Sequence, residues 1–153
     1  MMLLQMTMMT ADRGLLRDAV LACMAAVCAL TDLWCGKVFN AVTVPGLALG
    51  TICCISSAGA EGFLGVLCST AFTVAVLYPF FRAGGLGAGD IKLLAAVSAF
   101  MAPEAYLRCF CGAFVIGLAA GLLLLLFTRG KRHKVHFAVP VAASVLLHLA
   151  RLY

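Results

Sequence analysis

The chain has 153 residues, of which 65% are hydrophobic and only 11% are charged, and its mean hydropathy is +1.13. A soluble domain is closer to half apolar and a quarter charged, so this composition indicates an integral membrane protein without a separate soluble domain. The formal net charge of +5 is modest, and the basic residues have no aromatic residues interleaved with them, which argues against nucleic-acid binding.

Six apolar segments follow one another along the chain. They predict an all-α fold, a polytopic membrane bundle of about six transmembrane helices in one domain of residues 1–153, since a span needs about 20 residues. The segments are Leu15–Cys35, Val38–Ser57, Phe63–Phe81, Ile91–Ala102, Tyr106–Phe127 and Val135–Leu152. Residues 1–14 are rich in methionine, and we expect them to form a flexible N-terminal extension.

The fourth and sixth segments fit this scheme least well. The fourth is short for a span unless the glycine-rich run before it also lies at membrane depth. Non-helical backbone is tolerated there only where it is buried in protein or lines a wet cavity, so a water-accessible site is expected at this run. The sixth segment is interrupted by polar or helix-breaking residues, namely Pro140, His148 and Arg151.

The charged residues predict how the bundle lies in the membrane. The densest basic loop is Arg129–Lys134, which should be cytoplasmic. Six alternating spans then place Lys37, Arg82 and Lys92 on the same side, together with two acidic residues, Asp32 and Asp90. The other acidic residues fall on the opposite side: Asp12, Asp18, Glu61 and Glu104. Topology therefore predicts that two aspartates far apart in the sequence meet at one membrane face.

The run Gly84-Gly85-Leu86-Gly87-Ala88-Gly89-Asp90 carries the second of these aspartates. A carboxylate between membrane segments is costly and by default marks function. The glycines free the backbone before Asp90 from a regular helix and allow another backbone to approach it. Two close carboxylates share a proton, so one can activate water while the other polarises a peptide carbonyl. Asp32 and Asp90 together predict an aspartyl protease.

Helix ends suggest which aspartate carries the proton. Asp90 is expected at the N-terminal end of its helix and Asp32 at the C-terminal end of the first helix. A helix dipole favours negative charge at an N-terminus and disfavours it at a C-terminus. We therefore expect Asp90 to be the more ionised member and Asp32 the protonated one.

These motifs resemble the type 4 prepilin peptidase family. The frame Gly84-Gly85-x-Gly87-x-Gly89-Asp90-x-Lys92 is similar to the family's Gly-x-Gly-Asp signature, and Asp32 is followed by a basic residue and Asn40, as at the family's other aspartate. The chain departs from the family in having Val-Phe-Asn where Ile-Pro-Asn is common, and its late segment with Pro140 matches the final motif only loosely. It lacks the Cys-x-x-Cys domain of the bifunctional members and resembles the short, peptidase-only form of tight-adherence (Flp-type) pili.

The resemblance implies a site and its partners. It implies Asp32 and Asp90 as catalytic residues and Asn40 and Lys92 as supporting residues, without metal or cofactor. The active-site loop would contain the four glycines of the run, Gly84, Gly85, Gly87 and Gly89. The implied substrate is a prepilin with a basic leader and an apolar helix, cleaved at the cytoplasmic side of a bacterial cytoplasmic membrane. The lipid bilayer and the pilus-assembly machinery are the other partners implied.

Two other functions remain open from the residues alone. A proton-coupled transporter could use the two aspartates as a relay, but it predicts acidic residues spread through the membrane depth. An inactive structural subunit of a pilus or secretion apparatus could keep the motif without activity.

The eight cysteines contain no Cys-x-x-Cys pair and are interpreted as small apolar filler. Gly117 and Gly121 form a small-xxx-small pattern, interpreted as internal helix packing rather than dimerisation.

Overall fold

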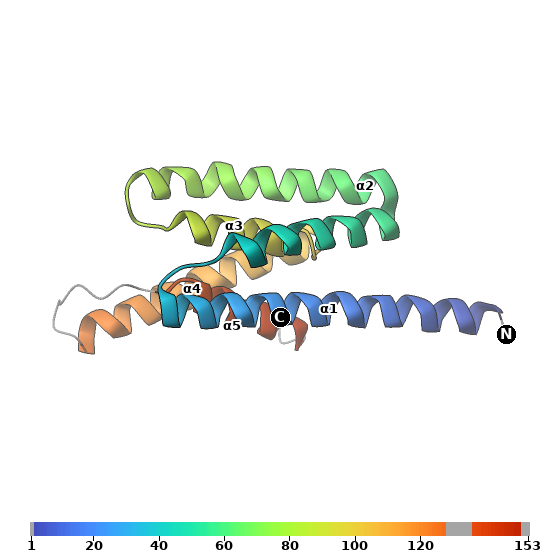
Figure 1. The fold of residues 1–153 in the computed structure, drawn as a ribbon, viewed down its shortest axis with the longest axis horizontal. Coiled ribbons are helices and arrows are strands. Elements are labelled where there is room, and N and C mark those ends of the chain that lie inside the picture. Colours follow the sequence, from blue (N-terminus) through green and yellow to red (C-terminus); the bar gives the residue numbers. More distant parts are fainter. Residues whose placement is uncertain (1, 128–135, 151–153) are drawn as a thin grey trace.

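The computed structural model describes residues 2–127 and 136–150, and all regular structure in these ranges is helical (Figure 1). The predicted all-α class is confirmed. The five helices are α1 (Met2–Cys35), α2 (Asn40–Arg82), α3 (Ala88–Ser98), α4 (Pro103–Phe127) and α5 (Ala138–Leu149). Because α1 begins at Met2, the backbone before Gly14 continues this helix, and its predicted flexibility stays a prediction.

Helix α2 contains a reversal of the chain at Gly59. This residue has φ 58° and ψ −136°, a conformation that side chains with a Cβ rarely adopt. The two arms of α2, residues 40–58 and 60–82, lie side by side in Figure 1. They correspond to the predicted segments Val38–Ser57 and Phe63–Phe81, joined by one glycine where the sequence predicted a loop.

The structure does not show the six transmembrane helices that were expected. Three helices are long and apolar enough to cross a membrane, over residues 14–35, 40–82 and 103–124. Helices α3 and α5 have only 11 and 12 residues, too few for a span of about 20. The cause lies at their starts, since the glycine run delays α3 until Ala88 and α5 begins only at Ala138. The three long helices indicate that the chain is a multi-pass membrane protein.

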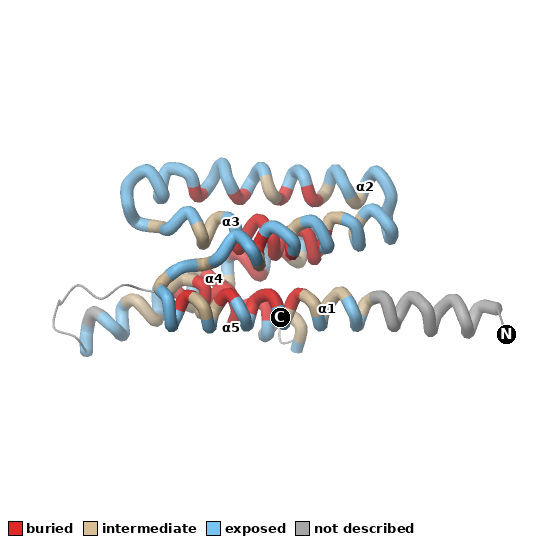
Figure 2. Tube along the Cα trace, viewed as in Figure 1, coloured by how far each residue is buried: buried red, intermediate tan, exposed pale blue. Residues whose placement is uncertain are grey.

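The core of the bundle surrounds α3. From Leu93 to Met101 every residue of α3 and of the turn after it is buried. Figure 2 shows this burial where α3 lies among the other helices, whereas the second arm of α2, residues 60–82, is largely exposed. The exposed side chains are mostly apolar, as expected of surfaces that face lipid. A short apolar helix can therefore be stable here because neighbouring helices enclose it.

Buried polar groups join the helices at several points. The Thr73 hydroxyl is hydrogen-bonded to the Tyr106 hydroxyl, which links α2 to α4. Ser144 of α5 donates to the carbonyl of Cys109 at 2.7 Å, which links α5 to α4. Such bonds between membrane helices satisfy groups that lipid cannot. All eight cysteines are free thiols.

Turns at one end of the bundle bring distant segments together. In Figure 1 the 36–39 turn, the 83–87 loop and the start of α5 all lie toward the same end. The Gly59 reversal and the turn after α3 lie toward the opposite end. The residues singled out in the sequence are concentrated at the first of these ends.

Candidate active site

Asp90 is the third residue of α3 and is held by the turn that precedes it. The N-cap residue, Gly87, has no side chain that could cap the helix. Instead the Gly87 N–H donates to Asp90 Oδ2 at 3.1 Å, and the Asp90 N–H donates to the Gly87 carbonyl at 3.1 Å. This is one half of a capping box, formed within four residues. The half-buried carboxylate is thereby fixed at the helix start.

The four glycines before Asp90 meet different requirements. Gly84 has φ 74°, in the left-handed region that favours glycine. Gly89 has an ordinary backbone, but a Cβ there would lie 3.0 Å from Val38 Cβ, so space excludes larger residues. A Cβ on Gly87 would lie 3.0 Å from Asp90 Oδ2, whereas one on Gly85 would meet only the Phe80 carbonyl at 3.6 Å. The close approach expected of this run therefore occurs chiefly at Gly89.

Asp32 lies in the last turn of α1 and is only 5% exposed. Gly36, at φ 61°, ends the helix, and its N–H donates to the Asp32 carbonyl at 2.8 Å. The Asp32 side chain reaches another helix: the Ala138 N–H, in the first turn of α5, donates to Asp32 Oδ2 at 3.4 Å. The two residues are 106 positions apart. Asp32 is thus held by tertiary structure.

The two aspartates line one cavity of about 880 Å³. One part of its wall contains Lys37 and all four of the predicted glycines. Another part is apolar and comes from the end of α2, from α4 and from the residue before α5: Phe80, Phe114, Gly117, Leu118 and Phe137. The structure therefore brings Asp32 and Asp90 to the same site, as the topology predicted.

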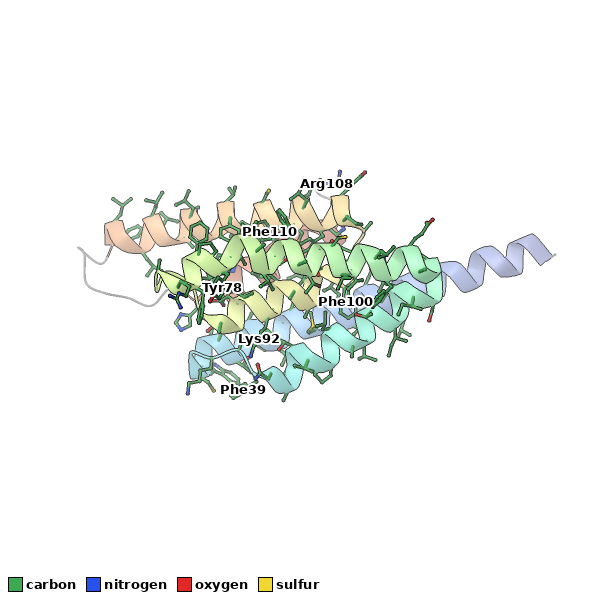
Figure 3. All side chains as sticks on the ribbon, turned by 90° about the horizontal axis from the view of Figure 1, so that it is seen from above. Phe39, Tyr78, Lys92, Phe100, Arg108 and Phe110 are labelled. Atoms are coloured by element: carbon green, nitrogen blue, oxygen red, sulfur yellow. The ribbon has the colours of Figure 1, made fainter. Side chains whose placement is uncertain are left out.

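Asn40 and Lys92 lie beside this site and outside the lining of the cavity. Lys92 Nζ donates to Asn40 Oδ1 at 3.0 Å, which joins α3 to the first residue of α2. Figure 3 shows Lys92 near Phe39 at this end of the bundle, with Phe100 and Arg108 toward the other end. The bond ties the segment after Asp32 to the helix that carries Asp90.

Sequence reasoning missed the contribution of α5 to the site. Ala138 donates to Asp32 through its backbone, so its side chain carries no signal for this role. Phe137 and Gly117 line the cavity and touch each other, because a Cβ on Gly117 would lie 3.0 Å from Phe137 Cε2. The small-xxx-small pattern was the available signal. Internal packing is confirmed for Gly117, whereas nothing lies within 4 Å of a Cβ placed on Gly121.

The helix-end argument does not separate the two carboxylates in the folded protein. Asp90 lies at the N-terminus of α3 and Asp32 at the C-terminus of α1, as expected. Asp32 also accepts a hydrogen bond from the N-terminus of α5, where a helix dipole favours negative charge. Both aspartates therefore face the start of a helix. The loop Arg129–Lys134, on which the membrane orientation depended, lies outside the described residues.

Comparison with known proteins places the chain in a family. Neither the curated proteins nor the solved structures include a significant match. The profile of the type IV leader peptidase family matches residues 19–128, which include Asp32, the glycine run and Asp90. This match covers more than half of the chain. With its two aspartates on one cavity of a membrane helix bundle, the chain belongs to the type IV leader peptidase family.

Proposed function

We propose that this protein is an aspartyl endopeptidase that removes the leader peptide from type 4, Flp-like prepilins. Asp32 and Asp90 form its catalytic dyad. The observation that carries the proposal is that these two carboxylates, from helices far apart in the sequence, line one cavity of about 880 Å³ together with a glycine loop. Membership of the leader peptidase family supports the reaction class.

The chemistry needs the two carboxylates in different protonation states. The ionised carboxylate takes a proton from a water molecule, whose oxygen attacks the scissile carbonyl carbon. The protonated carboxylate donates its proton to the carbonyl oxygen. When the C–N bond breaks, a proton returns to the leaving amine. Either aspartate can begin as the base, because each accepts a backbone N–H at a helix start.

The walls of the cavity suit an extended peptide that leads into an apolar helix. The glycine loop offers backbone without side chains beside Asp90, so a substrate strand can lie against it. The apolar wall contains Phe80, Phe114 and Phe137. A prepilin has an extended basic leader on one side of the cleaved bond and an apolar segment on the other, and it is the substrate class we assign.

The proposed setting is the cytoplasmic face of a bacterial cytoplasmic membrane. All six predicted segments would lie in the bilayer, counting the two arms of α2 separately. Helix α3 and α5 would reach only part of the way, with the glycine loop at membrane depth. Such backbone is tolerated there because it lines a cavity that admits water. The pilus-assembly machinery would receive the product.

The transporter alternative receives no comparable support. Of the acidic residues whose side chains the structure describes, only Asp32 and Asp90 line the large cavity. Asp18 pairs with Arg17 at 3.6 Å and lines a separate, smaller cavity. A proton relay through the membrane would need further acidic groups between these two cavities.

The test is co-expression with candidate Flp-like prepilins, followed by mass spectrometry of the new N-terminus. We expect one cut at the end of the basic leader. The double variant Asp32→Asn/Asp90→Asn should leave the prepilin intact, whereas the control Glu61→Gln/Glu104→Gln should cleave it normally, since neither glutamate lines the cavity. A cut that persists in the double aspartate variant would assign the cleavage to another enzyme.

A further inference from the structure

We propose that the start of α5 is a positioning element for Asp32, set by the contact between Phe137 and Gly117. In this arrangement α4 holds the Phe137 ring, the ring fixes the first turn of α5, and the Ala138 N–H of that turn holds the Asp32 carboxylate. The effect on catalysis rests on the proposed peptidase function. The effect on Asp32 itself does not, and it can be measured without a substrate.

The first step is the way α5 begins. Its N-cap residue, Phe137, makes no side-chain capping bond. The Val139 N–H donates to the His136 carbonyl at 3.3 Å, and Pro140 has no N–H to satisfy. The remaining N–H, that of Ala138, is buried and donates to Asp32 Oδ2. Asp32 therefore supplies from α1 the acceptor that α5 lacks at its own N-cap.

The second step is the way the Phe137 ring is held. Its centroid lies 5.1 Å from that of Phe114 on α4. The Phe114 ring lies 4.9 Å from Phe110, which lies 6.0 Å from Tyr106, so four rings follow one another toward the cavity. The far end of this series is fixed by the hydrogen bond between Tyr106 and Thr73. Aromatic pairs at these separations attract one another beyond the area they bury.

The third step is the lack of space between the ring and Gly117. A Cβ on Gly117 would lie 3.0 Å from Phe137 Cε2 and 3.4 Å from its Cδ2, so the ring would have to move by a few tenths of an ångström. Gly117 and Phe137 both line the cavity that contains Asp32. The ring therefore packs between Phe114 and Gly117, and a larger residue at position 117 fits only if the ring moves.

The hydrogen bond to Asp32 is sensitive to such a movement. At 3.4 Å, the Ala138–Asp32 bond is longer than the usual range for N–H donors. A further few tenths of an ångström at the start of α5 would break it. Asp32 would then lose its cross-helix partner and the orientation that it provides. A misplacement of about 1 Å caused far from the reacting atoms can reduce turnover about 100-fold, so a shift of a few tenths of an ångström is expected to reduce it less.

The experiment compares two glycines one helical turn apart on α4. Gly117→Ala adds a methyl group against Phe137, whereas Gly121→Ala adds it where nothing lies within 4 Å. Prepilin cleavage is measured per membrane-inserted enzyme. For Gly117→Ala we expect kcat to fall about tenfold with KM little changed, and for Gly121→Ala both should stay near wild type. A rise in KM at unchanged kcat would instead make this wall a substrate contact and overturn the proposal.

A second substitution distinguishes the proposed contact from general damage. Phe137→Leu replaces the ring with a smaller side chain and makes room for the added methyl group. The double variant Gly117→Ala/Phe137→Leu should therefore cleave faster than Gly117→Ala alone. Were the double variant slower than both single variants, the contact between the ring and position 117 would not be the cause of the loss.

Labelling of the carboxyl groups provides the readout that needs no substrate. Membranes are treated with dicyclohexylcarbodiimide, and the labelled peptides with Asp32 and Asp90 are quantified by mass spectrometry. Asp90, which is held by its own loop, is the internal reference. We expect the Asp32 to Asp90 ratio to rise several-fold in Gly117→Ala and to stay unchanged in Gly121→Ala. If Gly117→Ala is not inserted, Phe137→Ala should give the same rise.

The outcomes separate the two proposals. If the wild-type protein cleaves no prepilin but the labelling ratios change as expected, the peptidase assignment fails and the positioning role stands. If the wild-type protein cleaves its prepilin while Gly117→Ala cleaves and labels like wild type, the positioning role is overturned.

Discussion

The two aspartates of the cavity are held in different ways. Asp90 is half-buried, and its carboxylate accepts an N–H from Gly87, three residues before it. Asp32 is 5% exposed, and its carboxylate accepts an N–H from Ala138, 106 positions away. Each aspartate accepts an N–H at the start of a helix whose N-cap residue makes no side-chain capping bond. For Asp90 the helix is the one that carries it, and for Asp32 it is a different one.

This difference predicts how each aspartate responds to change. The position of Asp90 depends on a few neighbouring residues, so it should tolerate rearrangement elsewhere in the bundle. The position of Asp32 depends on the packing of α1, α4 and α5, so distant substitutions should reach it. In the proposed peptidase, one carboxylate would stay fixed while the other responds to packing.

The largest effect is expected from substitutions that prevent either carboxylate from exchanging a proton. Asp32→Asn and Asp90→Asn should each reduce prepilin cleavage by about 10³-fold or more, because a shared-proton pair fails when one member cannot exchange a proton. Asn keeps an acceptor oxygen, so the bonds to Ala138 and Gly87 can persist and both variants should insert normally. Cleavage is measured by mass spectrometry and normalised to inserted protein. Near-normal cleavage by either variant would exclude the dyad.

A smaller but still large effect is expected at the contact beside Asp90. Gly89→Leu places a side chain where even a Cβ would lie 3.0 Å from Val38, so the 36–39 turn and α3 must separate. We expect a loss of activity of about 100-fold with nearly normal insertion. Gly121→Ala is the control, because nothing lies within 4 Å of a Cβ there and the residue does not line the cavity. If Gly89→Leu cleaves normally, the loop is a linker and its close approach is irrelevant.

The contrast between the aspartates also explains what could be predicted from the sequence. The glycine run and its aspartate are adjacent residues, so their local geometry was predictable. That Asp32 and Asp90 line one cavity was predicted from alternating spans and the distribution of charge. The bond from Ala138 to Asp32 was not predictable, because a backbone donor leaves no mark in residue identity.

The number of spans was the weaker part of the prediction. Hydropathy located the apolar segments, but it does not report where a helix begins. Two short helices, α3 and α5, are stable because neighbours enclose them: every residue from Leu93 to Met101 is buried, and so is half of α5. The reversal between the segments Val38–Ser57 and Phe63–Phe81 was predicted, but as a loop, whereas the structure makes it at the single residue Gly59.

Removing the capping role as well as the charge should separate the two aspartates by stability. Asp32→Ala leaves the buried Ala138 N–H without its acceptor, which should lower the free energy of unfolding by about 1–3 kcal/mol. Asp90→Ala leaves the exposed Gly87 N–H to water, and should cost less than about 1 kcal/mol. Thermal unfolding in detergent would compare them. Equal losses would show that the two environments do not differ in the way the geometry indicates.

The bond between Lys92 and Asn40 should have a moderate effect. It joins the segment after Asp32 to α3 but lies at the exposed edge, where a single hydrogen bond contributes about 0.5–1.5 kcal/mol. Lys92→Met and Asn40→Ala should each lower cleavage by about 3- to 10-fold, and the double variant should be no worse than the more impaired single variant. Fully additive losses would mean that the two side chains act separately.

The smallest effect on activity is expected at Tyr106, which does not line the cavity. Its hydroxyl is bonded to Thr73 in the core, where lipid offers no replacement partner. Tyr106→Phe keeps the ring that packs on Phe110 and removes only this bond.

Hydrogen bonds between membrane helices contribute about 0.6 kcal/mol on average, so the free energy of unfolding should fall by about 1 kcal/mol or less. Cleavage per folded molecule should be unchanged, because the ring series toward Phe137 remains. Thr73→Val should match it in activity but lose more stability, because the Thr73 hydroxyl also donates to the Ser69 carbonyl at 2.7 Å and its removal leaves the buried Tyr106 hydroxyl without a partner. The double variant should be no less stable than Thr73→Val. A fall in cleavage per folded molecule would show that the aromatic series transmits small changes from the core to Asp32, and it would extend the sensitivity of that aspartate to the opposite side of the bundle.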